Sequence, residues 1–292
     1  MKALARLKFH PSSNPGSPMI YTPPTYTSAD HLESTDDSPP ATTAERQFLM
    51  EAVGYFRWYS PAVDPTLLPA VSHLSLQQVK PTRLTMAKLD RLLNYAYHHP
   101  NATIIYRPSN MQLHIHSDCS HHSEPNARSR TGIFMTCGKP IFNGLDKPAI
   151  VNGAIDVVSV ILKYVTGSVS ESEYGALYTA AVNACPHRQT LEDLGHPQNP
   201  CPITYDNEVA GKIARCTAKL KRSKAIAKCF HWIQDRIKHG EYVLHWAPGK
   251  LNLGDYFSKC HPVHHYRDMR SIYVSDIAHP ITLEWSRGCV EP

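Results

Sequence analysis

The chain has 292 residues, 42% of them hydrophobic, which is enough for one large domain or two smaller ones with packed cores. A formal net charge of +5 permits a polyanionic partner without establishing one. There is no run of about 18 apolar residues and no charged-then-apolar leader at Met1, so we expect neither a membrane span nor secretion. The eight cysteines are scattered without a C-x-x-C pair, which argues against a disulfide scaffold and fits an intracellular, cytoplasmic protein.

The N-terminal third divides by composition into two parts. Residues 1–43 carry repeated prolines among serines and threonines, which predicts an extended or disordered tether. Residues 44–110 show apolar residues at helical spacing in three stretches: before Pro61, over 67–76 and over 82–97. We predict a small helical module there, with its aromatic residues in the core.

Strand patterns begin at residue 111. Met111, Leu113 and Ile115 alternate with polar residues, which predicts a strand that ends near Asp118. A polar turn at 128–132 and an apolar strand at 133–137 would complete a hairpin, and the Val- and Ile-rich stretch 157–165 predicts a third antiparallel strand.

Helices and strands then alternate. Ser170 and Glu173 have the spacing of a capping box, which opens a helix that Pro186 should end or kink; capping is therefore one explanation of Glu173. A strand over 202–205 leads to Asp206 and a helix, and a last strand over 242–246 precedes a short helix at Asp255. The predicted fold class is α/β: a mixed five-stranded sheet flanked by helices and preceded by the helical module.

A basic segment lies between Lys212 and Lys250, with ten basic residues and two acidic ones. Such an imbalance suits contacts with phosphates, although a solvated helix face would also carry it. The candidate nucleic-acid contacts are Lys219, Lys221, Arg222 and Lys224.

Four acids occur at the edges of predicted elements: Asp118, Glu173, Asp206 and Asp255. If the fold brings them together, their mutual repulsion requires a cation between them. Two Mg²⁺ ions about 4 Å apart, with Mn²⁺ as the alternative, would meet that need and would activate a water molecule against a phosphodiester.

The chain also contains eighteen histidines. The groups His121–His122 and His261, His264, His265 lack a helical i, i+4 pair with a carboxylate partner, so we predict no zinc site at either group. His245 could assist product release, but packing on Trp246 explains it as well. We expect Asn252 to orient the loop near the last acid.

Several motifs together resemble one family. They are Ser117-Asp118-Cys119-Ser120, Glu171-Ser172-Glu173-Tyr174, the stretch Arg188 to Gly195, Asp206-Asn207-Glu208, Lys221 to Ala225, His231 to Arg236, Trp246 to Lys250, and Asn252 to Lys259. The chain resembles the C-terminal part of the polyprotein of copia-type long-terminal-repeat retrotransposons over roughly 112–274. In this family a ribonuclease H domain follows reverse transcriptase.

The resemblance implies four regions: 1–43, the tail of the polymerase palm; 44–110, a module like the thumb or connection; 111–275, an RNase H-like domain; and 276–292, a C-terminal tail. It also implies two-metal cleavage of the RNA strand of RNA–DNA hybrids, with Asp118, Glu173, Asp206 and Asp255 as catalytic and metal-binding residues. The expected partners are the hybrid and an upstream reverse transcriptase portion, in the cytoplasm, a virus-like particle or the nucleus. We expect no DNA synthesis, since the polymerase's paired-aspartate motif has no counterpart here.

Two rival functions follow from the same residues. A retroelement remnant could fold and bind nucleic acid without cleaving it; Cys119, Gly254, Ala227 and Cys229 depart from the family pattern. Strand transfer of the integrase kind is disfavoured, because that chemistry lacks a fourth acid in this context.

Overall fold

The computed structural model describes residues 2–23, 36–142, 148–214 and 227–276. Its centre is a five-stranded sheet in the order β5-β2-β1-β6-β7. The strands are β1 (Leu113–Glu124), β2 (Arg128–Cys137), β5 (Ala154–Ile161), β6 (Cys201–Tyr205) and β7 (Tyr242–Trp246). The pairs β1–β2 and β2–β5 are antiparallel, whereas β1–β6 and β6–β7 are parallel. The mixed five-stranded sheet predicted from the sequence is therefore confirmed.

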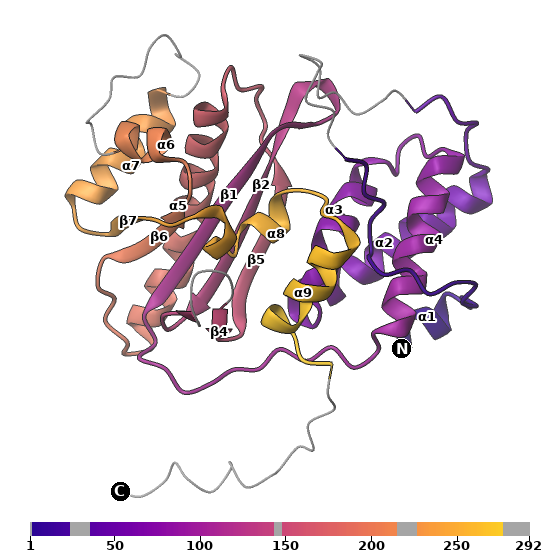
Figure 1. Ribbon diagram of the computed structural model, residues 1–292, viewed down its shortest axis with the longest axis horizontal. Helices are drawn as coiled ribbons and strands as arrows, with labels where there is room; N and C mark the ends of the chain where they lie inside the picture. The colour runs from indigo at the N-terminus through magenta and orange to yellow at the C-terminus, as the bar shows by residue number, and fades with distance from the viewer. Residues whose placement is uncertain (1, 24–35, 143–147, 215–226, 277–292) are drawn as a thin grey trace, which may run out of the picture.

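Helices cover both faces of the sheet (Figure 1). The long helix α5 (Val169–Asp193) packs on β1 and β2, where Leu113, Ile115 and Ile133 meet Leu177 in the main core. The helices α6 (Glu208–Ala214) and α7 (Ala227–Lys238) lie beside α5. On the other face, α8 (Asp255–Ser258) and α9 (Val263–Tyr273) form a second core that includes Phe134. A short two-stranded sheet joins β3 (Ile141–Phe142) and β4 (Pro148–Ile150).

A helical module stands at the other end of the molecule (Figure 1). It contains α2 (Thr43–Ala62), α3 (Leu68–Leu76) and α4 (Arg83–His98), around a core of their apolar residues. The α8–α9 segment lies between this module and the sheet, and Tyr256 donates a hydrogen bond to the carbonyl of Thr66 at 3.1 Å. The three predicted helices are present; the boundary between the two regions stays a prediction.

The described part of residues 1–43 packs against the helical module, although this segment is rich in proline. Residues Lys2–Arg6 form α1, and Leu4 and Leu7 are buried in the core of the helical module. Ser17 is also buried, and Arg91 donates to its carbonyl at 3.1 Å. Apolar residues before the first proline therefore anchor this segment to the module. Residues 24–35 and 277–292 lie outside the described residues.

The predicted turn at 128–132 is wrong, because these residues belong to β2 and the turn is at Pro125–Ala127. The polar residues suggested a turn, but Arg130 is buried and forms an ion pair with Glu124. Its Nε lies 2.5 Å from Glu124 Oε1. A paired charge can occupy an interior strand position. Because β1 and β2 extend to the turn at Pro125–Ala127, Asp118 lies inside β1, opposite Gly132, and not at a strand end.

The start of α5 also differs from the prediction. Ser168 caps it by accepting from the backbone N–H of Glu171, so the predicted capping box of Ser170 and Glu173 is wrong. Glu173 is consequently free of a capping role. The helix continues through Pro186. Because proline has no N–H, the Val182 carbonyl receives no hydrogen bond from it within the helix. Val182 is 40% exposed, so water can reach this turn instead.

Helix α9 was not predicted. Its sequence is rich in histidine and charged residues, but Tyr266 and Tyr273 are buried on one side of it. Among the helices of the described ranges, none has the length and apolarity that crossing a lipid bilayer requires.

Candidate functional site

Asp118 and Asp206 are brought together by strand register. The parallel strands β1 and β6 pair Ile115 with Ile203. Each aspartate is three residues beyond its member of that pair, so the two carboxylates lie at the same level of the sheet. A hydrogen bond from a side chain also holds the backbone of Asp206: Trp246 donates its indole N–H to the Asp206 carbonyl at 2.9 Å.

Glu173 reaches the same place from α5. It lies in the second turn of that helix, on the side that packs against β1, and its side chain is buried. Carboxylate oxygens of Asp118, Glu173 and Asp206 all lie within 4.8 Å of one another. Three acids, one in β1, one directly after β6 and one in α5, therefore form one cluster, which we call the acid cluster.

Burial and mutual repulsion disfavour the ionised forms of these acids. Burial, with the nearby charge of Asp255 as the next cause, raises the pKa of Asp118 to about 7. Burial and the charge of Asp118 raise the pKa of Glu173 well above its ordinary value. The pKa of Asp206 is raised by burial and then by Asp255. A bound cation would reverse this balance and favour the ionised forms.

Asp255 borders the acid cluster through Lys259. The Lys259 ammonium forms an ion pair with Asp255 Oδ1 and lies 4.0 Å from Asp118 Oδ2. Ser258 donates a hydrogen bond to the same Asp118 oxygen. The fourth predicted acid is therefore beside the other three, linked to them by a cationic side chain that the sequence reasoning did not single out.

Two glycines allow α8 to lie directly on the sheet. A Cβ at Gly132 would come within 2.3 Å of the Gly254 carbonyl oxygen and 2.5 Å of the Ser258 nitrogen. A Cβ at Gly254 would meet the Asp118 nitrogen at 3.0 Å. Close backbone approach of this kind is possible only without a side chain. It brings Asp255, at the start of α8, near Asp118.

The loop before α8 is tied to β1 by hydrogen bonds. Asn252 is buried and donates from Nδ2 to the Ser117 carbonyl at 2.8 Å, and its Oδ1 accepts from the Gly254 N–H at 3.1 Å. The Leu253 N–H donates to Nδ1 of His116 at 3.2 Å. Burial lowers the pKa of His116 to about 3, so the ring stays a neutral acceptor. The predicted orienting role of Asn252 agrees with these contacts.

The donor atoms of the acid cluster suit a hard divalent cation. All are carboxylate oxygens, the ligands that Mg²⁺ and Mn²⁺ prefer. Octahedral Mg²⁺ with bonds of about 2.0 to 2.1 Å needs neighbouring oxygens about 2.9 Å apart, so carboxylates near the 4.8 Å limit would move closer on binding. Asp118, Glu173 and Asp206 therefore fit one such ion; their role as ligands stays a prediction.

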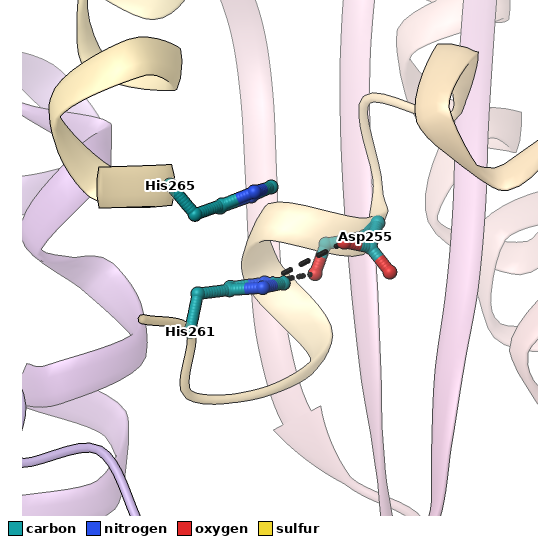
Figure 2. Close-up of side chains that lie close together, drawn as sticks. All are labelled: Asp255, His261 and His265. Carbon is teal, nitrogen blue, oxygen red and sulfur yellow. Dashed lines mark hydrogen bonds and ion pairs between the residues drawn. The ribbon is translucent and has the colours of Figure 1, made fainter. Parts of the chain in front are cut away.

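Asp255 has a second set of neighbours on its other side. Figure 2 shows His261 and His265 with their rings nearly parallel and both directed toward the Asp255 carboxylate. Oxygen and nitrogen atoms of the three residues lie within 4.8 Å of one another. The prediction that this group lacks an i, i+4 histidine pair with a carboxylate partner is therefore wrong. His261 and His265 are four residues apart, and Asp255 of α8 is the carboxylate beside them.

The other predicted site residues are four basic residues and His245. Lys219, Lys221, Arg222 and Lys224 lie outside the described residues, so their contact with nucleic acid stays a prediction. His245 is exposed on β7. Lys259, Ser258 and Gly132 were missed as site residues. The position of Lys259, four residues after Asp255, was a signal available in the sequence.

Comparison with models of known protein families finds no match, and comparison with characterised proteins by sequence finds none either. Solved structures do resemble this one. The N-terminal RNase H domain of a Mycobacterium tuberculosis protein, solved as a fusion with maltose-binding protein, shares 13% identity over 55% of this chain and 96% of that chain, with a TM-score of 0.36.

Two further structures contain nucleic acid. LC11-RNase H1, isolated from compost by metagenomics and solved with an RNA/DNA hybrid, has 15% identity over 50% of this chain and 94% of that chain, with a TM-score of 0.37. The foamy viral protease–reverse transcriptase, also with a hybrid, has 14% identity over 74% of this chain and 27% of that chain, with a TM-score of 0.40. The fold of this chain is α/β, a mixed five-stranded sheet flanked by helices, as its own strand order and directions describe.

Proposed function

We propose that this chain is a ribonuclease H that hydrolyses the RNA strand of RNA–DNA hybrids with divalent metal ions. The observation that carries the proposal is the convergence of Asp118, Glu173 and Asp206 within 4.8 Å. Buried acids at this spacing repel one another when ionised, and a bound cation would relieve that repulsion. The acid motifs that match the copia-type family are the same residues that converge, which supports a retrotransposon origin.

In this proposal Asp118, Glu173 and Asp206 hold one Mg²⁺, and Asp118 and Asp255 hold the other. When bound, the metal ions supply an activated water molecule and stabilise the departing oxygen. The water oxygen forms a new bond to phosphorus, the bond from phosphorus to the ribose 3′-oxygen breaks, and that oxygen takes up a proton. The chain's own residues position this chemistry: Ser258 and Asn252 hold the Asp118 strand and the α8 loop in fixed relation.

Selection of a hybrid would depend on surfaces around the acid cluster. The basic residues Lys219, Lys221, Arg222 and Lys224 are the proposed phosphate contacts, and a ribose 2′-hydroxyl in a wide minor groove would identify the RNA strand. Such an enzyme would act inside the cell, in the cytoplasm, the nucleus or a virus-like particle, beside an upstream reverse transcriptase portion.

A cleavage assay tests the proposal. Purified full-length chain is incubated with a hybrid labelled on its RNA strand, in Mg²⁺ or Mn²⁺, and compared with Asp206→Asn and with Asp193→Asn. Asp193 is an exposed acid at the end of α5 and serves as the matched control. We expect the unmodified chain and the control to cut only the RNA strand, and Asp206→Asn to lose at least about a hundredfold in rate.

The rival function gives a different result. If the unmodified chain shows the circular dichroism of a folded protein but cuts no hybrid with either metal, the chain is an inactive retroelement remnant. Retained binding of the hybrid in a filter or mobility-shift assay would then identify a nucleic-acid-binding protein. Equal cleavage by Asp206→Asn would also overturn the proposed roles of the acids.

A further inference from the structure

The group formed by Asp255, His261 and His265 has the composition of a separate metal site. It draws on α8, on the loop after it, and on the first turn of α9. His261 Nε2 is 3.6 Å from Asp255 Oδ2 and hydrogen-bonds to the Asp255 carbonyl at 3.0 Å. Figure 2 shows both contacts as dashed lines and both imidazole edges turned to the same carboxylate.

One ring nitrogen of the group is buried without a hydrogen-bond partner among the described residues. His265 Nε2 is inaccessible to solvent and has no hydrogen-bond partner among the described residues. An unsatisfied buried polar atom costs about 1 to 3 kcal/mol, so a fold retains one only where another interaction repays it. A metal ion bound to this nitrogen would supply that interaction.

The two imidazoles are held in place by ring stacking. Their centroids are 4.0 Å apart with an interplanar angle of 17°, and the buried ring of Tyr256 lies 6.1 Å from His261 and 6.2 Å from His265. Stacked rings lose little further freedom when they bind an ion. This preorganisation favours binding.

We propose that Asp255, His261 and His265 bind one transition-metal ion of the Zn²⁺ class, with a water molecule as the fourth ligand. Two imidazole nitrogens and one carboxylate suit Zn²⁺ and disfavour Mg²⁺, which takes oxygen ligands. Tetrahedral Zn²⁺ with bonds of about 2.0 to 2.1 Å places its ligand atoms about 3.4 Å apart. The separation of 3.6 Å between His261 and Asp255 is already close to this value.

Binding through Nε2 of His261 requires a change of tautomer. In the metal-free chain this nitrogen carries the proton that it donates to the Asp255 carbonyl. The ring remains neutral if the proton resides on Nδ1, which leaves the Nε2 lone pair for the ion. No oxidant or further reactant is involved.

Asp255 can serve this site and the acid cluster with different oxygens. Its Oδ1 pairs with Lys259 on the side of Asp118, whereas its Oδ2 is the atom nearest His261. The transition-metal site therefore shares one carboxylate with the acid cluster but has its own nitrogen ligands. Its existence does not depend on the proposed nuclease function.

Cobalt titration tests the site. Full-length chain freed of metal with EDTA is titrated with Co²⁺, whose four-coordinate complexes absorb strongly in visible light, and then with Zn²⁺ or excess Mg²⁺. The variants are His265→Gln, Asp206→Asn and, as the matched control, His264→Gln, which changes an exposed neighbouring histidine outside the group.

We expect one strongly absorbing Co²⁺ per chain in the unmodified protein, His264→Gln and Asp206→Asn, displaced by Zn²⁺ but not by Mg²⁺. His265→Gln should weaken Co²⁺ binding at least about tenfold, because removing even a residue that only hydrogen-bonds to a metal ligand typically lowers metal affinity by about this factor. Equal binding by His265→Gln, or no such absorption in the unmodified chain, overturns the proposal. X-ray absorption of the Zn²⁺-loaded unmodified chain decides independently of any variant: two imidazole ligands support the site, and an all-oxygen shell refutes it.

Discussion

The ammonium of Lys259 lies between two acids, paired with Asp255 and 4.0 Å from Asp118 Oδ2. It therefore offsets part of the negative charge that the acid cluster concentrates beside α8. A divalent cation bound there would compete with it for the same oxygens.

Lys259→Met should make the metal-free chain less stable and more responsive to Mg²⁺. Without the ammonium, the carboxylates repel one another more strongly in EDTA and attract a cation more strongly. We expect a lower melting temperature in EDTA, by a few degrees, and a larger rise on adding Mg²⁺. Differential scanning fluorimetry measures both. Lys163→Met, at an exposed lysine after β5, should behave like the unmodified chain. A smaller Mg²⁺ response in Lys259→Met would contradict this account.

Acidity should stabilise the metal-free chain. Because burial and the charge of Asp255 raise the pKa of Asp118 to about 7, the folded state keeps a proton that the unfolded state releases near the ordinary value of 3.8. The free energy of unfolding from this group therefore falls as pH rises from about 4 to about 7. Thermal unfolding in EDTA between about pH 5 and about pH 8 should show this slope, and Asp118→Asn should flatten it. An unchanged slope in Asp118→Asn would place the titration elsewhere.

Gly132→Ala should displace α8. The new methyl group would meet backbone atoms of Gly254, Phe257 and Ser258 at 2.3 to 2.6 Å, and a backbone cannot yield as a flexible side chain does. We expect a loss of about 1 to 3 kcal/mol in stability and a further loss of any Mg²⁺ response, since Asp255 moves with α8. Urea unfolding measures the loss of stability.

Gly54→Ala is the matched control for this test. Gly54 lies inside α2 with no atom within 4 Å of an added Cβ, so alanine should stabilise the helix by up to about 1 kcal/mol. If Gly132→Ala is as stable as the unmodified chain, the close contact with α8 does not restrict this position.

Arg270→Met should weaken the attachment of α9 to the helical module. Arg270 Nη1 donates to both oxygens of Asp64, at 3.0 and 2.9 Å, and Asp64 is fully buried. Removing the guanidinium leaves a buried carboxylate without its cation, which costs about 3 to 5 kcal/mol. Denaturant unfolding measures the loss. Arg267→Met, on the same helix with a side chain 76% exposed, should change stability by less than about 1 kcal/mol.

Local pattern was enough to predict most elements of the sheet. Alternation in Leu113 to Ile115 and the apolar run near Ile133 identified β1 and β2, because each side of a strand meets one environment. The pattern failed where tertiary contacts changed what a residue does. Arg130 resembled a turn residue but is buried beside Glu124, and Pro186 resembled a helix end but lies inside α5.

The sequence by itself was enough to single out Asp118, Glu173, Asp206 and Asp255 as candidates, since each acid stands at the edge of a predicted element. Only the tertiary structure decided how they meet: parallel register aligns Asp118 with Asp206, and the helix packing of α5 adds Glu173. It also decided that Asp255 faces both Lys259 and His261. The physical reason is that motifs and periodicity report only neighbours along the chain. Distances between acids on different elements follow from sheet register, from close backbone contact at Gly132 and from the burial that surrounds them.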